Sequence, residues 1–212
     1  MRWPRIIFIA LLVLIFGAFL HYTLPQRDIV RITGTEIIRQ DFSGLNRIFY
    51  AQGDSGNAQP DSRDLRLINA VFPDRVNEAG EVTRAGSVMV YRNEDTGFGW
   101  PPYFKLDSAD LHAEASNLTS TGADPRWVAI THYGWRSRLL TTYPNAVEIR
   151  LVDGPDVTLI PWLSILILLG LAFVAFMAWR IWERFEDRVI DPIRDRLAVQ
   201  WAKLKDRAAG RG

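Results

Sequence analysis

The sequence predicts a membrane protein of the α+β class, in which two transmembrane helices flank a small β-rich domain and a C-terminal amphipathic helix follows. Three observations lead to this prediction. Two apolar runs long enough to cross a bilayer lie near the two ends of the 212-residue chain. Between them, short segments rich in β-branched residues alternate with turn residues. After the second run, apolar residues recur at helical spacing.

The first apolar run covers residues 6–20, all of which are apolar or glycine. Trp3 and Tyr22 flank it about 28 Å apart at 1.5 Å per residue, close to the thickness of the hydrocarbon layer. Such rings prefer the membrane interface. A cleaved signal peptide is the alternative, but the small-residue cleavage motif is missing after the run. We therefore expect residues 1–24 to be an uncleaved anchor.

The second run, residues 159–179, contains no charged residue and has tryptophans at its flanks. Its main polar side chain is Ser164, whereas a buried helix of a soluble protein would show a polar face. Residues 159–179 are therefore predicted to be the second transmembrane helix.

Basic residues predict the orientation. Arg2 and Arg5 precede the first run, and arginines crowd the segment after the second. Because positive charge stays inside, both termini are expected in the cytoplasm and residues 25–158 outside it, in the periplasm of a bacterial inner membrane. That middle segment carries 14 basic and 18 acidic residues, which argues against nucleic acid as a partner. The lipid bilayer is an expected partner.

The middle segment is predicted to form one domain of five strands and one helix. The strands are expected at residues 28–39, 64–72, 87–91, 127–133 and 146–152. Asp107 is expected to cap the helix, on which Leu111, Ala115 and Leu118 share one face. Three strands, a helix and two strands is the order of an OB-type barrel. Another small barrel or a sandwich with an accessory helix also fits.

Two loops interrupt this pattern. Residues 51–64 are rich in turn residues and are expected to be a mobile excursion. Residues 93–104 combine two glycines and two prolines with Phe98, Trp100, Tyr103 and Phe104. Such a loop either closes the core or forms a contact surface for a protein partner or for membrane headgroups.

Several segments are distinctive as sequence labels: HYTLP at residues 21–25, DIVR at 28–31, YRNEDTG at 91–97, GWPPYF at 99–104, THYGWR at 131–136 and YPN at 143–145. By these segments, and by the second apolar run with its basic exit, the chain resembles an uncharacterised family of bacterial two-span membrane proteins. That family is classed only as a domain of unknown function. The resemblance covers all but about the last twenty residues. It implies the topology and a bacterial inner membrane, and it assigns no catalytic role.

The sequence offers little reactive chemistry. The absence of cysteine excludes thiol catalysis, zinc–thiolate sites and disulfides. No histidine has a second one at metal-ligand spacing, and no nucleophile or phosphate-binding motif is present, so no catalytic, metal or cofactor-binding residue is predicted. His132 is expected to make a structural hydrogen bond. Catalysis around it with Tyr133 and Arg136 is the alternative.

The tail, residues 180–212, has a regular apolar stripe. It consists of Trp182, Phe185, Val189, Ile193, Leu197, Trp201 and Leu204. Asp191 and Pro192 fit an N-cap and a first helical position, so one helix is expected to end and another to begin there. The stripe must be covered, either by lipid or by another helix, and near-balanced charges over residues 180–195 favour protein.

These features favour a non-enzymatic membrane protein, an accessory subunit or assembly partner of a larger inner-membrane complex. Its candidate contact surfaces are the spans, the aromatic loop and the tail stripe, and its partner is another integral membrane protein or a second copy. A ligand-binding or sensing module of the envelope is one alternative, and an envelope enzyme working around His132 is another.

Overall fold

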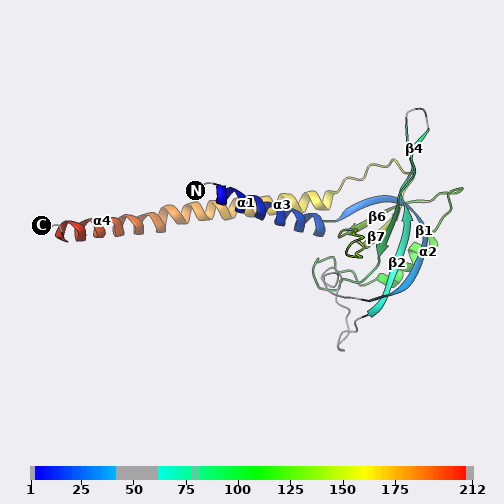
Figure 1. Ribbon diagram of the computed structural model, residues 1–212, viewed down its shortest axis with the longest axis horizontal. Coiled ribbons are helices and arrows are strands. Elements are labelled where there is room, and N and C mark those ends of the chain that lie inside the picture. The colour runs from blue at the N-terminus through cyan, green and yellow to red at the C-terminus, as the bar shows by residue number, and fades with distance from the viewer. Residues whose placement is uncertain (1–2, 42–61, 78, 80, 209–212) are drawn as a thin grey trace. The chain divides into compact units, whose positions relative to one another are not determined.

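The computed structural model describes residues 3–41, 62–77, 79 and 81–208 (Figure 1). The predicted excursion at residues 51–64 falls almost entirely outside this range. The chain divides into two compact units, Met1–Pro161 and Trp162–Gly212. The first unit contains the N-terminal helix and the whole β-domain, and the second contains the C-terminal helices.

The first unit begins with helix α1, Trp3–Thr23. Its side chains are mostly exposed, and none is buried inside the protein. By length and composition the helix is apolar enough to cross a membrane. Exposing an apolar surface of this extent to water is unfavourable in free energy, so the surface needs an apolar environment.

Five strands form a closed barrel in the order β1-β2-β5-β7-β6. They are β1 (Gln26–Asp41), β2 (Ser62–Val71), β5 (Val88–Arg92), β6 (Trp127–Tyr133) and β7 (Asn145–Leu151), with helix α2 (Ser108–Asn117) between β5 and β6. Neighbouring strands are antiparallel except the pair β5–β7. The predicted β-rich domain with one helix is therefore confirmed, and it is a barrel. A two-stranded hairpin of β3 (Arg75–Val76) and β4 (Val82–Arg84) was not predicted.

The barrel closes through its longest strand, β1. The first part of β1, up to Arg31, pairs with β6, and the part from Arg31 onward pairs with β2. The register shifts between Ile32 and Gly34, next to the change of partner. A bulge of this kind bends a strand, so that one strand can serve two neighbours around a tight barrel.

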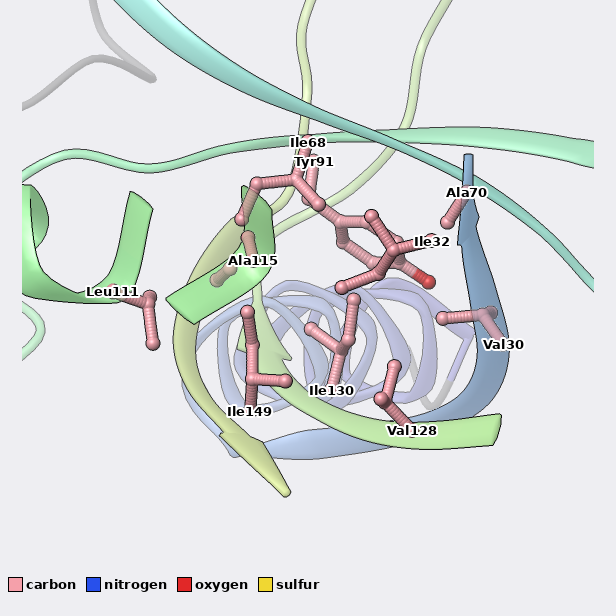
Figure 2. Close-up of a cluster of buried hydrophobic side chains, with 11 residues drawn as sticks. Val30, Ile32, Ile68, Ala70, Tyr91, Leu111, Ala115, Val128, Ile130 and Ile149 are labelled. Carbon is pink, nitrogen blue, oxygen red and sulfur yellow. The ribbon is translucent and has the colours of Figure 1, made fainter. Parts of the chain in front are cut away.

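Eleven buried residues make the main core, and Figure 2 shows ten of them labelled, turned toward one another inside the barrel. Val30 and Ile32 of β1 and Val128 and Ile130 of β6 each lie two residues apart, so each pair projects from the same face of its strand. Leu111 and Ala115 of α2 join them, as the helical spacing predicts. Each buried Ile or Val contributes roughly 1.5–3 kcal/mol to stability.

The cap of α2 differs from the prediction. Asp107 occupies the N-cap position but makes no side-chain capping bond. The carboxylate of Asp95 accepts from the Ser108 amide at 2.8 Å and from the Ser108 hydroxyl at 3.0 Å. The loop before the helix folds back and brings Asp95 to the helix start, so the capping acid comes from thirteen residues before Ser108.

The described part of the second unit, residues 162–208, is helical throughout. It consists of α3 (Trp162–Phe185), a π-helical turn η2 (Glu186–Ile190) and α4 (Asp191–Ala208). The first residue of α4 is Asp191, but it has helical backbone angles (φ −64°, ψ −45°) and the helix continues through it, so the predicted end of one helix and start of another at this point is wrong. In a regular α-helix, the ring of Pro192 would collide with the carbonyl of Arg188. The wider π turn lies directly before this proline and accommodates it.

Candidate functional site

The C-terminal end of α1 is hydrogen-bonded to the barrel domain. A helix leaves its last four carbonyl groups without partners inside the helix. Here the amide of Gly134 donates to the Tyr22 carbonyl at 2.9 Å, and the Tyr103 hydroxyl donates to the Thr23 carbonyl at 2.6 Å. The Gln26 side chain donates to the carbonyl of His21 at 2.8 Å. Groups from three parts of the β-domain therefore hold the end of this apolar helix.

Aromatic rings pack around the same junction, the contact between the last residues of α1 and the barrel domain. Tyr103 stacks on Tyr133 with 4.8 Å between ring centroids, and Tyr22 meets Tyr133 edge-on at 6.2 Å. Trp135 packs edge-on against Tyr22 at 5.3 Å, and its indole N–H donates to Nδ1 of His21 at 2.9 Å. Large rings in these geometries bury much surface and restrict rotation. They fix the direction in which α1 leaves the barrel.

A buried polar cluster supports the rings from inside. Arg92 is 2% exposed and forms a 2.9 Å ion pair with Glu94. The amide of Asn145 bonds to both backbone groups of Glu94 and donates to the Tyr133 hydroxyl at 3.1 Å. Burial raises the pKa of Tyr133, although the nearby Arg92 charge opposes the rise. The cluster ties β5, β6 and β7 together at the end of the barrel that faces α1.

A second polar group lies beside the core. The Asp28 carboxylate accepts from the Tyr91 hydroxyl at 2.7 Å and contacts Nε2 of His132 at 2.9 Å. Burial alone would raise the pKa of Asp28, but the hydrogen bonds and charge of His132, with the Tyr91 bond, outweigh it and lower that pKa. The pKa of Tyr91 is raised well above its ordinary value, first by burial and then by the Asp28 charge.

His132 therefore makes the hydrogen bond that the sequence predicts, and its partner is a carboxylate. The residue is 3% exposed, and its Nδ1 is buried with no hydrogen-bond partner among the described residues. A general base must reach its substrate within hydrogen-bond distance. Both ring nitrogens are enclosed in this arrangement, which fits a structural role better than a catalytic one.

Lys105 is a buried lysine between the aromatic loop and α2, three residues before the helix begins. It is 4% exposed, and its ammonium group donates to the Asn93 side chain and, at 2.7 Å, to the carbonyl of Ala146. Burial lowers its pKa to about 8, against the opposing charges of Asp107, Asp95 and Glu94. Through these bonds Lys105 attaches the end of the aromatic loop to β7.

The aromatic loop divides between the two roles that the sequence leaves open. Tyr103 closes the junction, as described above. Phe98, Trp100 and Phe104 are 86%, 65% and 58% exposed, and the rings of Phe98 and Phe104 lie 5.9 Å apart. Trp100 stacks on Phe19, near the end of α1, at 5.5 Å. Three of the four aromatic side chains of this loop are thus exposed, and one of them, Trp100, lies against α1.

The tail stripe belongs to the second unit. Trp182 and Phe185 lie in α3, Val189 lies in η2, and Ile193, Leu197 and Trp201 lie in α4. All six are exposed, between 39% and 72%. Leu204 lies in α4, and its side chain is outside the described part of the chain.

The junction residues missed as candidates from the sequence are Asp28, Arg92, Lys105, Gly134 and Asn145. Four of them stand within the segments that carry the family resemblance. The structure brings Arg92, Gly134 and Asn145 to the end of the barrel next to α1, whereas Asp28 lies along β1 opposite Ile130 of β6. Lys105 gives a separate signal, because it is the one charged residue of the run 96–106. Among the described residues, no group of three or more His, Asp or Glu is placed to hold a metal ion.

Comparison with known proteins agrees with the resemblance found in these segments. An uncharacterized protein of Haemophilus influenzae (strain ATCC 51907 / DSM 11121 / KW20 / Rd) is 34% identical over 183 residues, which cover 82% of this chain and 93% of that protein. No solved structure matches the chain. Residues 1–186 match the family model described as protein of unknown function (DUF1523). The chain therefore belongs to the DUF1523 family.

Proposed function

We propose that this protein is a non-enzymatic integral membrane protein with two spans, an accessory subunit or assembly partner of a larger complex in the bacterial inner membrane. Both termini lie in the cytoplasm, and an OB-type barrel lies in the periplasm. The stripe on the C-terminal helix contacts an integral membrane partner or a second copy of the chain.

The two-span topology is supported by the two long apolar helices and by the position of the segments that leave them. Arginines flank both helices on the ends away from the barrel domain. On the barrel side, Arg27 at the start of β1 donates to the carbonyl of Ile160 at 3.1 Å, two residues before α3 begins. The chain thus enters the barrel domain from α1 and leaves it toward α3 at neighbouring points of the same domain.

The OB assignment is supported by strand order. The helix α2 lies between the third and fourth strands of the barrel, and the third and fifth strands pair in parallel. Closure in the order 1-2-3-5-4, counting barrel strands only, fits the Greek-key connection of that barrel type. Because unrelated functions share this fold, it does not by itself identify a ligand.

The exposed tail stripe is the observation that carries the proposal. Between Phe185 and Trp201 its members are four residues apart, and each such step in an α-helix overshoots a full turn by about 40°. Uncorrected, the stripe would wind around the helix. The π turn η2 takes more residues per turn, so it reduces the overshoot where it lies. The apolar side chains from Phe185 to Ile193 therefore wind less around the helix, which favours contact with a single neighbouring helix.

The charges beside the stripe favour protein over lipid. Arg180 pairs with Glu183 at 3.1 Å, and Arg194 lies 3.8 Å from Asp191 and 3.9 Å from Glu186. Arginines that are paired with acids attract an anionic leaflet less than free ones. An uncompensated basic face would be expected for a leaflet-binding helix.

Native mass spectrometry of the full chain, extracted from its own membrane in mild detergent, tests the proposal. We expect a stoichiometric companion or a defined oligomer. Leu197→Glu should abolish it, because the charge falls within the stripe. The neighbouring substitution Ala198→Glu, about 100° around the helix, should leave it intact. A lone monomer for the unmodified protein would contradict the proposal.

A sensing module is the second candidate, favoured by the direct bonds between the barrel and the carbonyls of α1. A ligand that shifted Tyr103 or Gly134 would act on the helix end without an intermediate. Thermal unfolding of the full chain with a panel of periplasmic metabolites tests this function. A reproducible rise in the unfolding temperature with one of the metabolites would support this function. No rise with any metabolite of the panel would count against it.

A further inference from the structure

The end of the barrel next to α1 has two loops whose surfaces are rich in apolar side chains and carry no exposed acid. The first, residues 96–106, contains the exposed aromatic side chains, and its one charged residue, Lys105, is buried. Its outer surface therefore has no charged group. The second loop, residues 135–142, connects β6 to β7 and contains Trp135 and Leu139 with two arginines and no acid.

Both loops adjoin the end of α1. Trp100 stacks on Phe19 with 11° between the ring planes, and Phe19 lies four residues before the last residue of the helix. That distance is about 6 Å along the axis. Trp135 bonds to His21 and packs on Tyr22. Ring contacts and hydrogen bonds therefore set both loops at the level where the apolar helix ends.

We propose that these two loops, through Phe98, Trp100 and Phe104 in one and Leu139 in the other, insert into the outer surface of the lipid bilayer and seat the barrel on the membrane. This inference rests on the two-span topology proposed above. If α1 crosses the bilayer, its barrel end lies at the exported interface, and a ring stacked on Phe19 lies there too. Aromatic side chains are most favourable at that depth.

The chemistry of the loops fits lipid better than a protein partner. Trp100 stacks on Phe19 of α1, so lipid around α1 also reaches Trp100, and no additional protein is needed to cover it. The second loop exposes 92% of Leu139 at its tip, next to the exposed Arg138. An apolar tip with a basic neighbour suits the acyl boundary beneath anionic headgroups. The occupant is therefore the outer leaflet itself, with anionic lipid beneath the second loop.

Because the chain contains no cysteine, single-cysteine labelling tests this directly. The full chain is reconstituted in vesicles of phosphatidylcholine and phosphatidylglycerol, with an environment-sensitive fluorophore at one of four positions. Phe98→Cys and Leu139→Cys report on the loops. Val13→Cys reports on the middle of α1. Leu151→Cys is the matched control, an exposed apolar residue at the opposite end of β7, about 20 Å from Asn145.

We expect labels at positions 98 and 139 to emit at shorter wavelength than the label at 151, and nitroxide-labelled lipid to quench them several-fold more. Replacing phosphatidylglycerol with phosphatidylcholine should weaken the quenching at 139 and leave that at 98 unchanged.

Three results would overturn the proposal in distinguishable ways. Labels at 98 and 139 that behave like 151, with a deeply quenched label at 13, would refute the seating while leaving the spans intact. Blue-shifted emission at 98 without lipid quenching would assign the loop to contact with a second copy. An unquenched label at 13 would remove the two-span topology and the seating together.

Discussion

The Tyr103 hydroxyl donates a hydrogen bond of 2.6 Å to the carbonyl of Thr23, the last residue of α1. The two residues are 80 positions apart in the chain, and the phenol ring of Tyr103 stacks on the ring of Tyr133. Burial raises the pKa of Tyr103, so the hydroxyl stays protonated and able to donate at any physiological pH. One side chain of the aromatic loop thus connects the barrel core to the end of the apolar helix.

Tyr103→Phe should destabilise the protein by about 1–3 kcal/mol, because the ring contact stays while the Thr23 carbonyl loses its donor. Thermal unfolding of the full chain in detergent measures this. Tyr143→Phe is the control. The contact of Tyr143 is made by its ring, which lies 4.4 Å from the Arg136 guanidinium, and phenylalanine keeps that ring. Equal effects of the two substitutions would refute the assigned role of the Tyr103 hydroxyl.

Gly134→Ala should weaken the same junction through the backbone. Gly134 has φ of +93°, a conformation that residues with a Cβ rarely adopt, and its amide donates to Tyr22. The expected cost is about 1–3 kcal/mol. Gly122→Ala, where a Cβ meets nothing within 4 Å, should cost little. Hydrogen exchange of the residues around the α1 end should rise in the first variant only, and unchanged exchange there would contradict the prediction.

Asp28→Asn should remove a charged acceptor shared by Tyr91 and His132, at a cost of about 1.5–3 kcal/mol near neutral pH. The folded-state pKa of Asp28 is lowered, so its stabilisation is complete above the unfolded pKa, near 4, and is lost as the pH falls through the folded value. The difference between wild type and variant should therefore shrink in acid. Unfolding midpoints at several acidic pH values measure it. Asp153→Asn, at an exposed site, should show no such convergence.

The strands and the helix α2 could be predicted from the sequence because their cause is local. The two-residue spacing of Val30 and Ile32 in β1 and the four-residue spacing of Leu111 and Ala115 in α2 follow from burial of one face. The hairpin of β3 and β4 gives no such signal, since its strands are short and the described side chains of β4 are exposed. The membrane crossing of α1 and α3 stays a prediction from length and composition.

The junction could not be predicted, because most of its bonds join residues far apart in sequence. Arg92 and Lys105 are charged and belong by type at the surface. They are buried only because Glu94, Asn93 and the Ala146 carbonyl meet them in the folded chain. The expected cap at Asp107 fails for the same reason, since Asp95 reaches the helix start from a neighbouring loop. Of the aromatic loop, the sequence could not tell that Tyr103 turns inward and its neighbours outward.

Lys105 should make the protein more stable in mildly alkaline solution. Its pKa falls from 10.5 in the unfolded chain to about 8 in the folded one, so between these values the unfolded chain binds more protons. Stability then rises with pH, by roughly 2 kcal/mol between about pH 8 and pH 9.5. Tyr91, Tyr103 and Tyr133 have raised pKa values, and their opposite effect begins only near pH 10.

Lys105→Met should lower stability at neutral pH, because the Asn93 and Ala146 acceptors lose their donor, and should also abolish the alkaline gain. Lys205→Met, at an exposed site in α4, should keep that gain. Chemical unfolding of the barrel is monitored by hydrogen exchange, with the exchange rates corrected for the pH dependence of the intrinsic rate. The stabilities of both variants are compared with that of wild type. If the stability of Lys105→Met rose with pH in parallel with wild type, the ammonium group of Lys105 would not be the source of the effect.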